Sequence, residues 1–124
     1  MRDARYPVTM AGDVPVVVAP EEIDITNAAG LSATLLDLAA QGHAAVVIDM
    51  TKTQFCDTAG LQVLVGAHRR GLADGHEVRA AISGGSVSRI LAITGIDRVI
   101  PQFTSVEDAV SAPVSGLGDH RRGS

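Results

Sequence analysis

Apolar and polar positions along the chain follow two repeat lengths, the short one of strands and the longer one of helices. The apolar run Val46–Ile48 stops at Asp49 and is typical of a short strand buried on both faces. From Thr58 the apolar spacing becomes i, i+3, i+4, i+7 and i+11, which predicts a helix to about Ala73. The helix therefore begins just beyond the carboxyl end of a strand.

The remaining pattern predicts an N-terminal hairpin followed by alternating helices and strands. Ala11-Gly12-Asp13 is a turn sequence between two β-prone runs, and Thr26 or Asn27 is suited to cap the first helix. The expected strands are Tyr6–Met10, Val14–Ala19, Ala44–Asp49, Glu77–Ile82 and Val99–Phe103. The expected helices follow Asp24, begin at Thr58, begin at Ser86, and run from Val106 to Ala112. This order predicts one α/β domain, a mostly parallel mixed sheet with an N-terminal hairpin strand, covered by about four helices.

The end of the chain has a different composition. From Pro113 onward Gly, Ser, His and Arg show no apolar periodicity. We therefore expect the domain to span residues 1–112 and the tail, residues 113–124, to be disordered.

Composition narrows the class of protein. With 46% hydrophobic and 19% charged residues, the chain is an ordinary globular sequence, and three aromatic residues leave little for a base-stacking surface. A net charge of −4 gives no electrostatic attraction to nucleic acid. No apolar run approaches the ~20 residues that span a membrane, and a single cysteine fits a reducing compartment, so we expect a cytoplasmic protein. The histidines show no metal-ligand spacing, and we expect neither metal nor cofactor.

The candidate chemistry lies at Asp57-Thr58-Ala59-Gly60. The predicted helix start places the Thr58 hydroxyl beside free N–H groups and the positive end of the helix dipole, where a phosphate is well accommodated. Ala59 and Gly60 would keep the first turn small enough for another molecule to approach. The alternative is that the Thr58 hydroxyl only caps the helix.

Three segments carry a resemblance to a known family. Val46 to Leu61 resembles the signature of STAS domains, specifically bacterial anti-sigma factor antagonists, in which an apolar strand ending in Asp leads to Asp-Ser-[Ser/Ala]-Gly-Leu. Glu21 to Asp24 is similar to the family's Gly-Glu-Leu-Asp, with Glu in place of Gly. Ser83 to Ile96 is similar to its late strand–turn–helix. The resemblance covers roughly Tyr6 to Ala112.

The resemblance implies roles for individual residues. Thr58 stands at the Ser that the partner anti-sigma kinase phosphorylates; it keeps the hydroxyl and adds a methyl group that stiffens the side chain. The implied partner-binding residues are Glu22, Asp24, Asp57, Thr58, Ala59 and Gly60. For Asp24 and Asp57 the alternative is local capping of the two helices.

The resemblance also implies a function. The dephosphorylated chain would bind an anti-sigma factor, a serine/threonine kinase of the ATPase fold, and release a sigma factor. Phosphorylation at Thr58 by the same partner, with its own ATP and Mg²⁺, would switch the complex off, and a phosphatase would restore it. The chain itself would be no enzyme. The alternative is a STAS subunit of another assembly, a lipid-transport or stress-signalling complex, without a phospho-switch.

Cys56 has two interpretations. It is either a buried small hydrophobic residue or a redox-sensitive thiol whose pKa the nearby helix N-terminus lowers. An enzyme using Cys56 or Asp57 is a third reading of the site, but no His or Asn is placed by sequence to activate the thiol.

Overall fold

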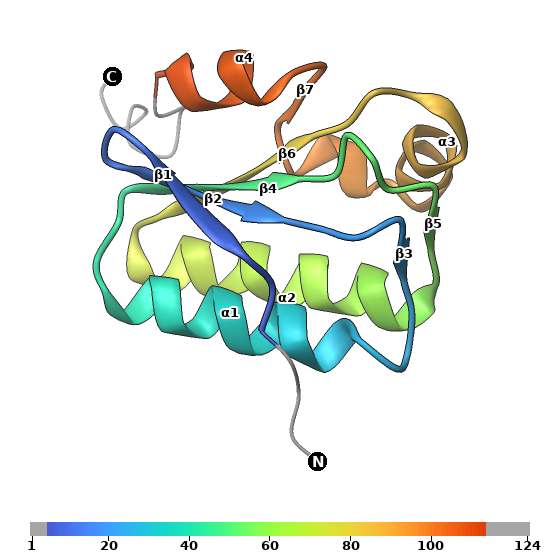
Figure 1. The fold of residues 1–124 in the computed structure, drawn as a ribbon, viewed down its shortest axis with the longest axis horizontal. Coiled ribbons are helices and arrows are strands. Elements are labelled where there is room, and N and C mark those ends of the chain that lie inside the picture. The colour runs from blue at the N-terminus through green and yellow to red at the C-terminus, as the bar shows by residue number, and fades with distance from the viewer. Residues whose placement is uncertain (1–4, 114–124) are drawn as a thin grey trace.

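The computed structural model describes residues 5–113, which form a five-stranded sheet with helices on both faces (Figure 1). The strands are β1 (Val8–Ala11), β2 (Val14–Val18), β4 (Ala45–Asp49), β6 (Glu77–Ala81) and β7 (Gln102–Phe103), in the spatial order β1-β2-β4-β6-β7. β1 and β2 are antiparallel, and every other neighbouring pair is parallel. The predicted mixed sheet with an N-terminal hairpin is therefore confirmed.

Helices cover the two faces unequally. The helices are α1 (Ala28–Ala40), α2 (Thr58–Asp74), α3 (Gly85–Thr94) and α4 (Val106–Ser111). The larger core includes residues of α1, α2 and α3, with α1 and α2 on one face of the sheet and α3 at its end, while the smaller core lies under α4 on the other face (Figure 1). Val46 and Ile48 belong to the first core and Val47 to the second, which explains the unbroken apolar run of β4.

Local signals place the helix ends close to their expected positions. α2 ends at Asp74 and is followed by Gly75, whose φ of 84° is the left-handed conformation that glycine adopts without strain. α4 begins after Ser105, whose side chain accepts a hydrogen bond from the backbone N–H of Asp108.

One predicted strand is too long. Residues Ile96–Arg98 form a turn of 3₁₀ helix after Gly95, and the N–H groups of Val99 and Ile100 both donate to the carbonyl of Ile96. Because the backbone there is still turned, the strand expected from Val99 begins only at Gln102.

The pattern missed a second, two-stranded sheet. β3 (Glu22–Ile23) and β5 (Phe55–Cys56) pair in parallel, with Glu22 opposite Phe55 and Ile23 opposite Cys56. Figure 1 shows this pair at the end of the main sheet where α3 lies.

The predicted domain boundaries stay predictions. Residues 1–4 and the tail from residue 114 lie outside the described residues. Within residues 5–113, no helix is both long enough and apolar enough to cross a membrane.

Candidate functional site

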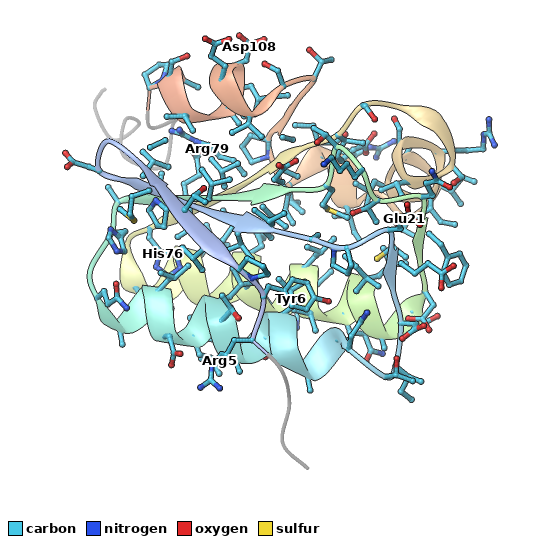
Figure 2. The ribbon with its side chains drawn as sticks, viewed as in Figure 1. Arg5, Tyr6, Glu21, His76, Arg79 and Asp108 are labelled. Carbon is cyan, nitrogen blue, oxygen red and sulfur yellow. The ribbon has the colours of Figure 1, made fainter. Side chains whose placement is uncertain are left out.

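The β3–β5 pair brings the two acidic segments of the sequence together. The N–H of Gln54 donates to the carbonyl of Glu21 at 2.7 Å, and the N–H of Asp57 donates to the carbonyl of Ile23 at 3.0 Å. Glu21 lies at the end of the molecule that carries this pair (Figure 2). The segment from Glu21 to Asp24 is therefore joined along its backbone to the segment that precedes Thr58.

Asp57 caps α2. Its Oδ1 accepts hydrogen bonds from the N–H groups of Ala59 at 2.9 Å and Gly60 at 3.3 Å, and its carbonyl accepts from the N–H of Leu61 at 3.0 Å. The local capping role considered for Asp57 is thus present. The expectation that these N–H groups stand free for a phosphate is wrong, because the carboxylate already occupies those of Ala59 and Gly60.

The Thr58 hydroxyl is not the helix cap. Thr58 is the first residue of α2, its side chain is exposed, and no hydrogen bond joins the hydroxyl to another residue of the described part of the chain. It stands at one end of a groove of about 430 Å³ between α2 and the end of α3. The groove is lined by Thr58, Leu61, Gln62, Val65, Gly66, Arg69, Thr94 and Ile96.

Gly60 serves packing and not outward approach. It is buried, and a Cβ atom on it would lie 2.6 Å from Cys56 Sγ and 2.7 Å from Ile23 Cγ2. Only glycine lets the first turn of α2 lie this close to the β3–β5 pair. The expectation that Gly60 leaves room for an approaching molecule is therefore wrong. Ala59 is half-buried and lines a second groove, of about 230 Å³, between α1 and α2.

Cys56 is a packing residue in this structure. The residue is 6% exposed, and burial, followed by the nearby charge of Asp57, raises the pKa of the thiol to about 11. A thiol that stays protonated at neutral pH is a poor nucleophile and reacts slowly with oxidants. The redox alternative depends on a lowered thiol pKa, and burial first, then the Asp57 carboxylate at the helix N-terminus, act in the opposite direction.

Asp24 and Glu22 face solvent to different degrees. Asp24 Oδ1 accepts hydrogen bonds from Thr26 N at 2.9 Å and Thr26 Oγ1 at 2.5 Å, and these bonds lower the pKa of the Asp24 carboxyl. Its carbonyl accepts from the N–H of Ala28 at the start of α1, but the N-cap position is Asn27, so the Asp24 side chain closes a local turn with Thr26 and does not cap the helix. Glu22 is exposed. Glu22 of β3 and Asp24 directly after it thus add two carboxylates near Asp57, which directly follows β5.

Sequence reasoning missed two residues near this site. Asn27 was expected only as a possible cap, yet its side chain caps nothing and bonds instead to the backbone of Glu22 and Asp24. The hydroxyl of Tyr6 bonds to Asn27. The available signal was an Asn close after Asp24, since Asn side chains often bond to nearby backbone in turns. Nothing in the pattern pointed to Tyr6.

Among residues 5–113, no group of three or more His, Cys, Asp and Glu side chains is arranged to hold a metal ion. The site presents the exposed hydroxyl of Thr58 near the carboxylates of Asp57, Asp24 and Glu22.

Comparison with known proteins identifies the family. The family model for the STAS domain matches residues 6–109, and the chain belongs to this family. A similar curated protein is the anti-sigma-F factor antagonist RsfB of Mycobacterium tuberculosis, 28% identical over 108 residues that cover 86% of each chain.

Solved structures share the fold. An anti-sigma factor antagonist from Mycobacterium paratuberculosis aligns with a TM-score of 0.78 at 24% identity, covering 86% of this chain and 90% of that one. SpoIIAA in its unphosphorylated form aligns with a TM-score of 0.72 at 18% identity, covering 89% and 99%. The phosphorylated form of Bacillus SpoIIAA aligns with a TM-score of 0.67 at 15% identity, covering 85% and 96%.

Proposed function

We propose that this protein is an anti-sigma factor antagonist whose binding is switched by phosphorylation at Thr58. The dephosphorylated form binds an anti-sigma factor, an ATPase-fold serine/threonine kinase, and thereby frees a sigma factor. The partner supplies the ATP and Mg²⁺, and a phosphatase reverses the modification. The family membership and the likeness to RsfB support this class of function.

The observation that carries the proposal is the exposed, unbonded hydroxyl of Thr58. Capping of α2 is done by Asp57, so Thr58 is free to react without loss of a structural hydrogen bond. A partner that contacts Thr58 also meets the acidic segment of β3, because Ile23 and Asp57 are joined through their backbones. We infer that Glu22, Asp24, Asp57, Thr58 and Ala59 form the partner surface, with Gly60 packing beneath it.

Electrostatics explains why phosphorylation would act as a switch. A phosphate adds about −1.5 to −2 charges at pH 7. It would stand beside the Asp57 carboxylate, which already uses the N–H groups of the first turn of α2. The added charge and bulk would therefore fall on the surface offered to the partner, where like-charge contact weakens binding.

The test uses the purified anti-sigma factor with ATP and Mg²⁺. We expect Thr58→Glu to keep the native circular dichroism spectrum and to bind the partner about tenfold to a hundredfold more weakly in calorimetry. Thr58→Ala should bind like the wild type but accept no phosphate. The matched control is Thr104→Glu, which places the same charge on an exposed threonine between β7 and α4.

The control should bind and be phosphorylated like the wild type. Equal affinity of wild type and Thr58→Glu, without phosphate uptake at Thr58, would contradict the switch. A tight complex with a different assembly would then favour the alternative, a STAS subunit without a phospho-switch. No catalysis by this chain is expected, because Cys56 is buried and protonated and Asp57 is engaged as a cap.

A further inference from the structure

Tyr6 is a buried polar group that the proposed function leaves unused. It is the only tyrosine of the chain and is 7% exposed. Its N–H donates to Thr34 Oγ1 of α1 at 2.9 Å, and its hydroxyl lies 3.2 Å from both the carbonyl oxygen and Oδ1 of Asn27. Figure 2 shows Tyr6 between the sheet and α1. Burial raises the pKa of Tyr6 to about 12, so the hydroxyl remains a donor at neutral pH.

Asn27 links this hydroxyl to the acidic segment. Its Nδ2 donates to the carbonyl of Glu22 at 2.8 Å, and its Oδ1 accepts from the N–H of Asp24 at 2.9 Å. One carboxamide therefore bonds the backbone on both sides of Ile23. The same Oδ1 receives the hydroxyl of Tyr6, which anchors the carboxamide to the main body of the protein.

The anchored segment leads directly to Thr58. Ile23 pairs with Cys56 in the β3–β5 sheet, and the carbonyl of Ile23 accepts the N–H of Asp57. Asp57 in turn caps the helix turn that carries Thr58. Hydrogen bonds and the short backbone of β3 thus connect Tyr6, through Asn27, to the start of α2.

We propose that Tyr6 and Asn27 are positioning residues for recognition of the anti-sigma factor, which they do not themselves contact. They hold the segment from Glu22 to Asp24 at a fixed distance from Thr58, so that a partner meets both on one preformed surface. This inference rests on the proposed function. A preformed surface binds more tightly than a mobile one, because less conformational entropy is lost on association.

Two substitutions test the anchor. Tyr6→Phe removes the hydroxyl and keeps the ring in the core, whereas Asn27→Ala removes both side-chain bonds to the loop. We expect the Kd for the anti-sigma factor to rise about threefold to tenfold in Tyr6→Phe and further in Asn27→Ala. The double variant should bind nearly as weakly as Asn27→Ala alone, since the Tyr6 hydroxyl acts on the loop through the Asn27 carboxamide. All measurements are made at a temperature where circular dichroism shows each variant fully folded.

The control separates positioning from general stability. Thr34→Val removes the bond to the backbone N–H of Tyr6 but leaves the hydroxyl bonded to Asn27. It should lower the melting temperature without changing the Kd. A Kd raised as much in Thr34→Val as in Tyr6→Phe would overturn the assignment, as would unchanged binding in Tyr6→Phe and Asn27→Ala.

A measurement without the partner distinguishes failure of this inference from failure of the proposed function. Amide hydrogen exchange of Asp24 and Asp57 should be faster in Tyr6→Phe than in the wild type, while Val47 in the central strand exchanges unchanged. If the wild type binds no anti-sigma factor, the proposed function fails and exchange alone decides whether the anchor exists. Equal exchange at Asp24 and Asp57 in both proteins would overturn the anchor.

Discussion

At the scale of single residues, the surroundings of Gly60 define how closely α2 approaches the β3–β5 pair. A Cβ atom on Gly60 would lie 2.6 Å from Cys56 Sγ, a distance at which something must shift. We expect Gly60→Ala to lower the free energy of unfolding by about 1–3 kcal/mol, the usual cost of overpacking a core. Urea denaturation measures this loss.

Gly66 provides the matched control on the same helix. A Cβ atom there would meet nothing within 4 Å beyond its chain neighbours and the nearby backbone of its own helix. Gly66→Ala should therefore stabilise the helix by about 0.5–1 kcal/mol through reduced backbone entropy of the unfolded chain. Wild-type stability in Gly60→Ala would show that the helix does not lie against Cys56 as described.

Cys56 makes stability depend on pH in the alkaline range. The thiol pKa is about 11 in the folded protein and 9.0 as the unperturbed value. Between these values the unfolded chain has released the proton and the folded chain has not, so rising pH favours unfolding. The contribution of Cys56 is therefore complete below pH 9 and is lost as pH rises toward 11.

The free energy of unfolding measured from pH 7 to 11 checks this dependence. The fall above pH 9 should be smaller in Cys56→Ser, which we expect to fold with a loss of about 1 kcal/mol at pH 7. A remaining slope is expected in both proteins, because the pKa of Tyr6 is also raised. Rapid labelling of the native thiol at pH 8 would contradict the packing role.

At the scale of elements, α4 is held to the sheet by a buried arginine. Arg79 of β6 is 1% exposed; its Nε donates to Glu77 Oε1 and its Nη1 to the carbonyl of Ala109, both at 2.8 Å. Figure 2 shows Arg79 between the sheet and α4. The arginine thus bonds a carbonyl in the last turn of α4 from beneath the helix.

We expect Arg79→Met to lower the free energy of unfolding by about 3–5 kcal/mol, the usual cost of removing one member of a buried ion pair. Urea denaturation measures the loss, and amide exchange should report faster opening of α4. The comparison is Arg5→Ala, which removes a pair with Asp37 in which both side chains are more than half exposed and should cost less than about 1 kcal/mol. Similar losses in the two variants would contradict the role of Arg79.

Periodicity predicted the longer elements and missed the shortest. β4 and α2 each carry an apolar repeat long enough to identify its type, so their ranges agree with the structure within a residue or two. β3 and β5 are two residues long and exist only because they pair across a wide sequence separation. No local pattern encodes that pairing.

The sequence also could not show which residue caps α2. Asp57 and Thr58 are adjacent, and both residue types cap helices, so the pattern alone did not choose between them. In the structure the cap is Asp57, whose backbone is extended with ψ of −173°. The position of the site was predictable because a helix following a parallel strand starts at the carboxyl edge of the sheet. The hydrogen bonds of Tyr6 were not predictable, because they form only when the segment before β1 packs against α1 and Asn27.

At the scale of the whole molecule, we expect the folded unit to end with α4. α4 ends at Ser111, and Pro113 is exposed. A protein cut after Ala112 should keep the melting temperature of the full chain, because the removed residues show no apolar periodicity. Calorimetry tests this directly. A drop of about 4 °C or more would correspond to about 1 kcal/mol of lost contacts and would place part of the tail in the fold.

The cap on α2 also bears on how long a signal at Thr58 would persist. Asp57 already holds the N–H groups of Ala59 and Gly60, so a group attached to the Thr58 hydroxyl would gain no backbone donors from them and would remain in water. Folding would then neither protect the attached group nor expel it. The proportion of modified molecules would then be set by the rates of the enzymes that attach and remove the group. The fold itself would favour neither form.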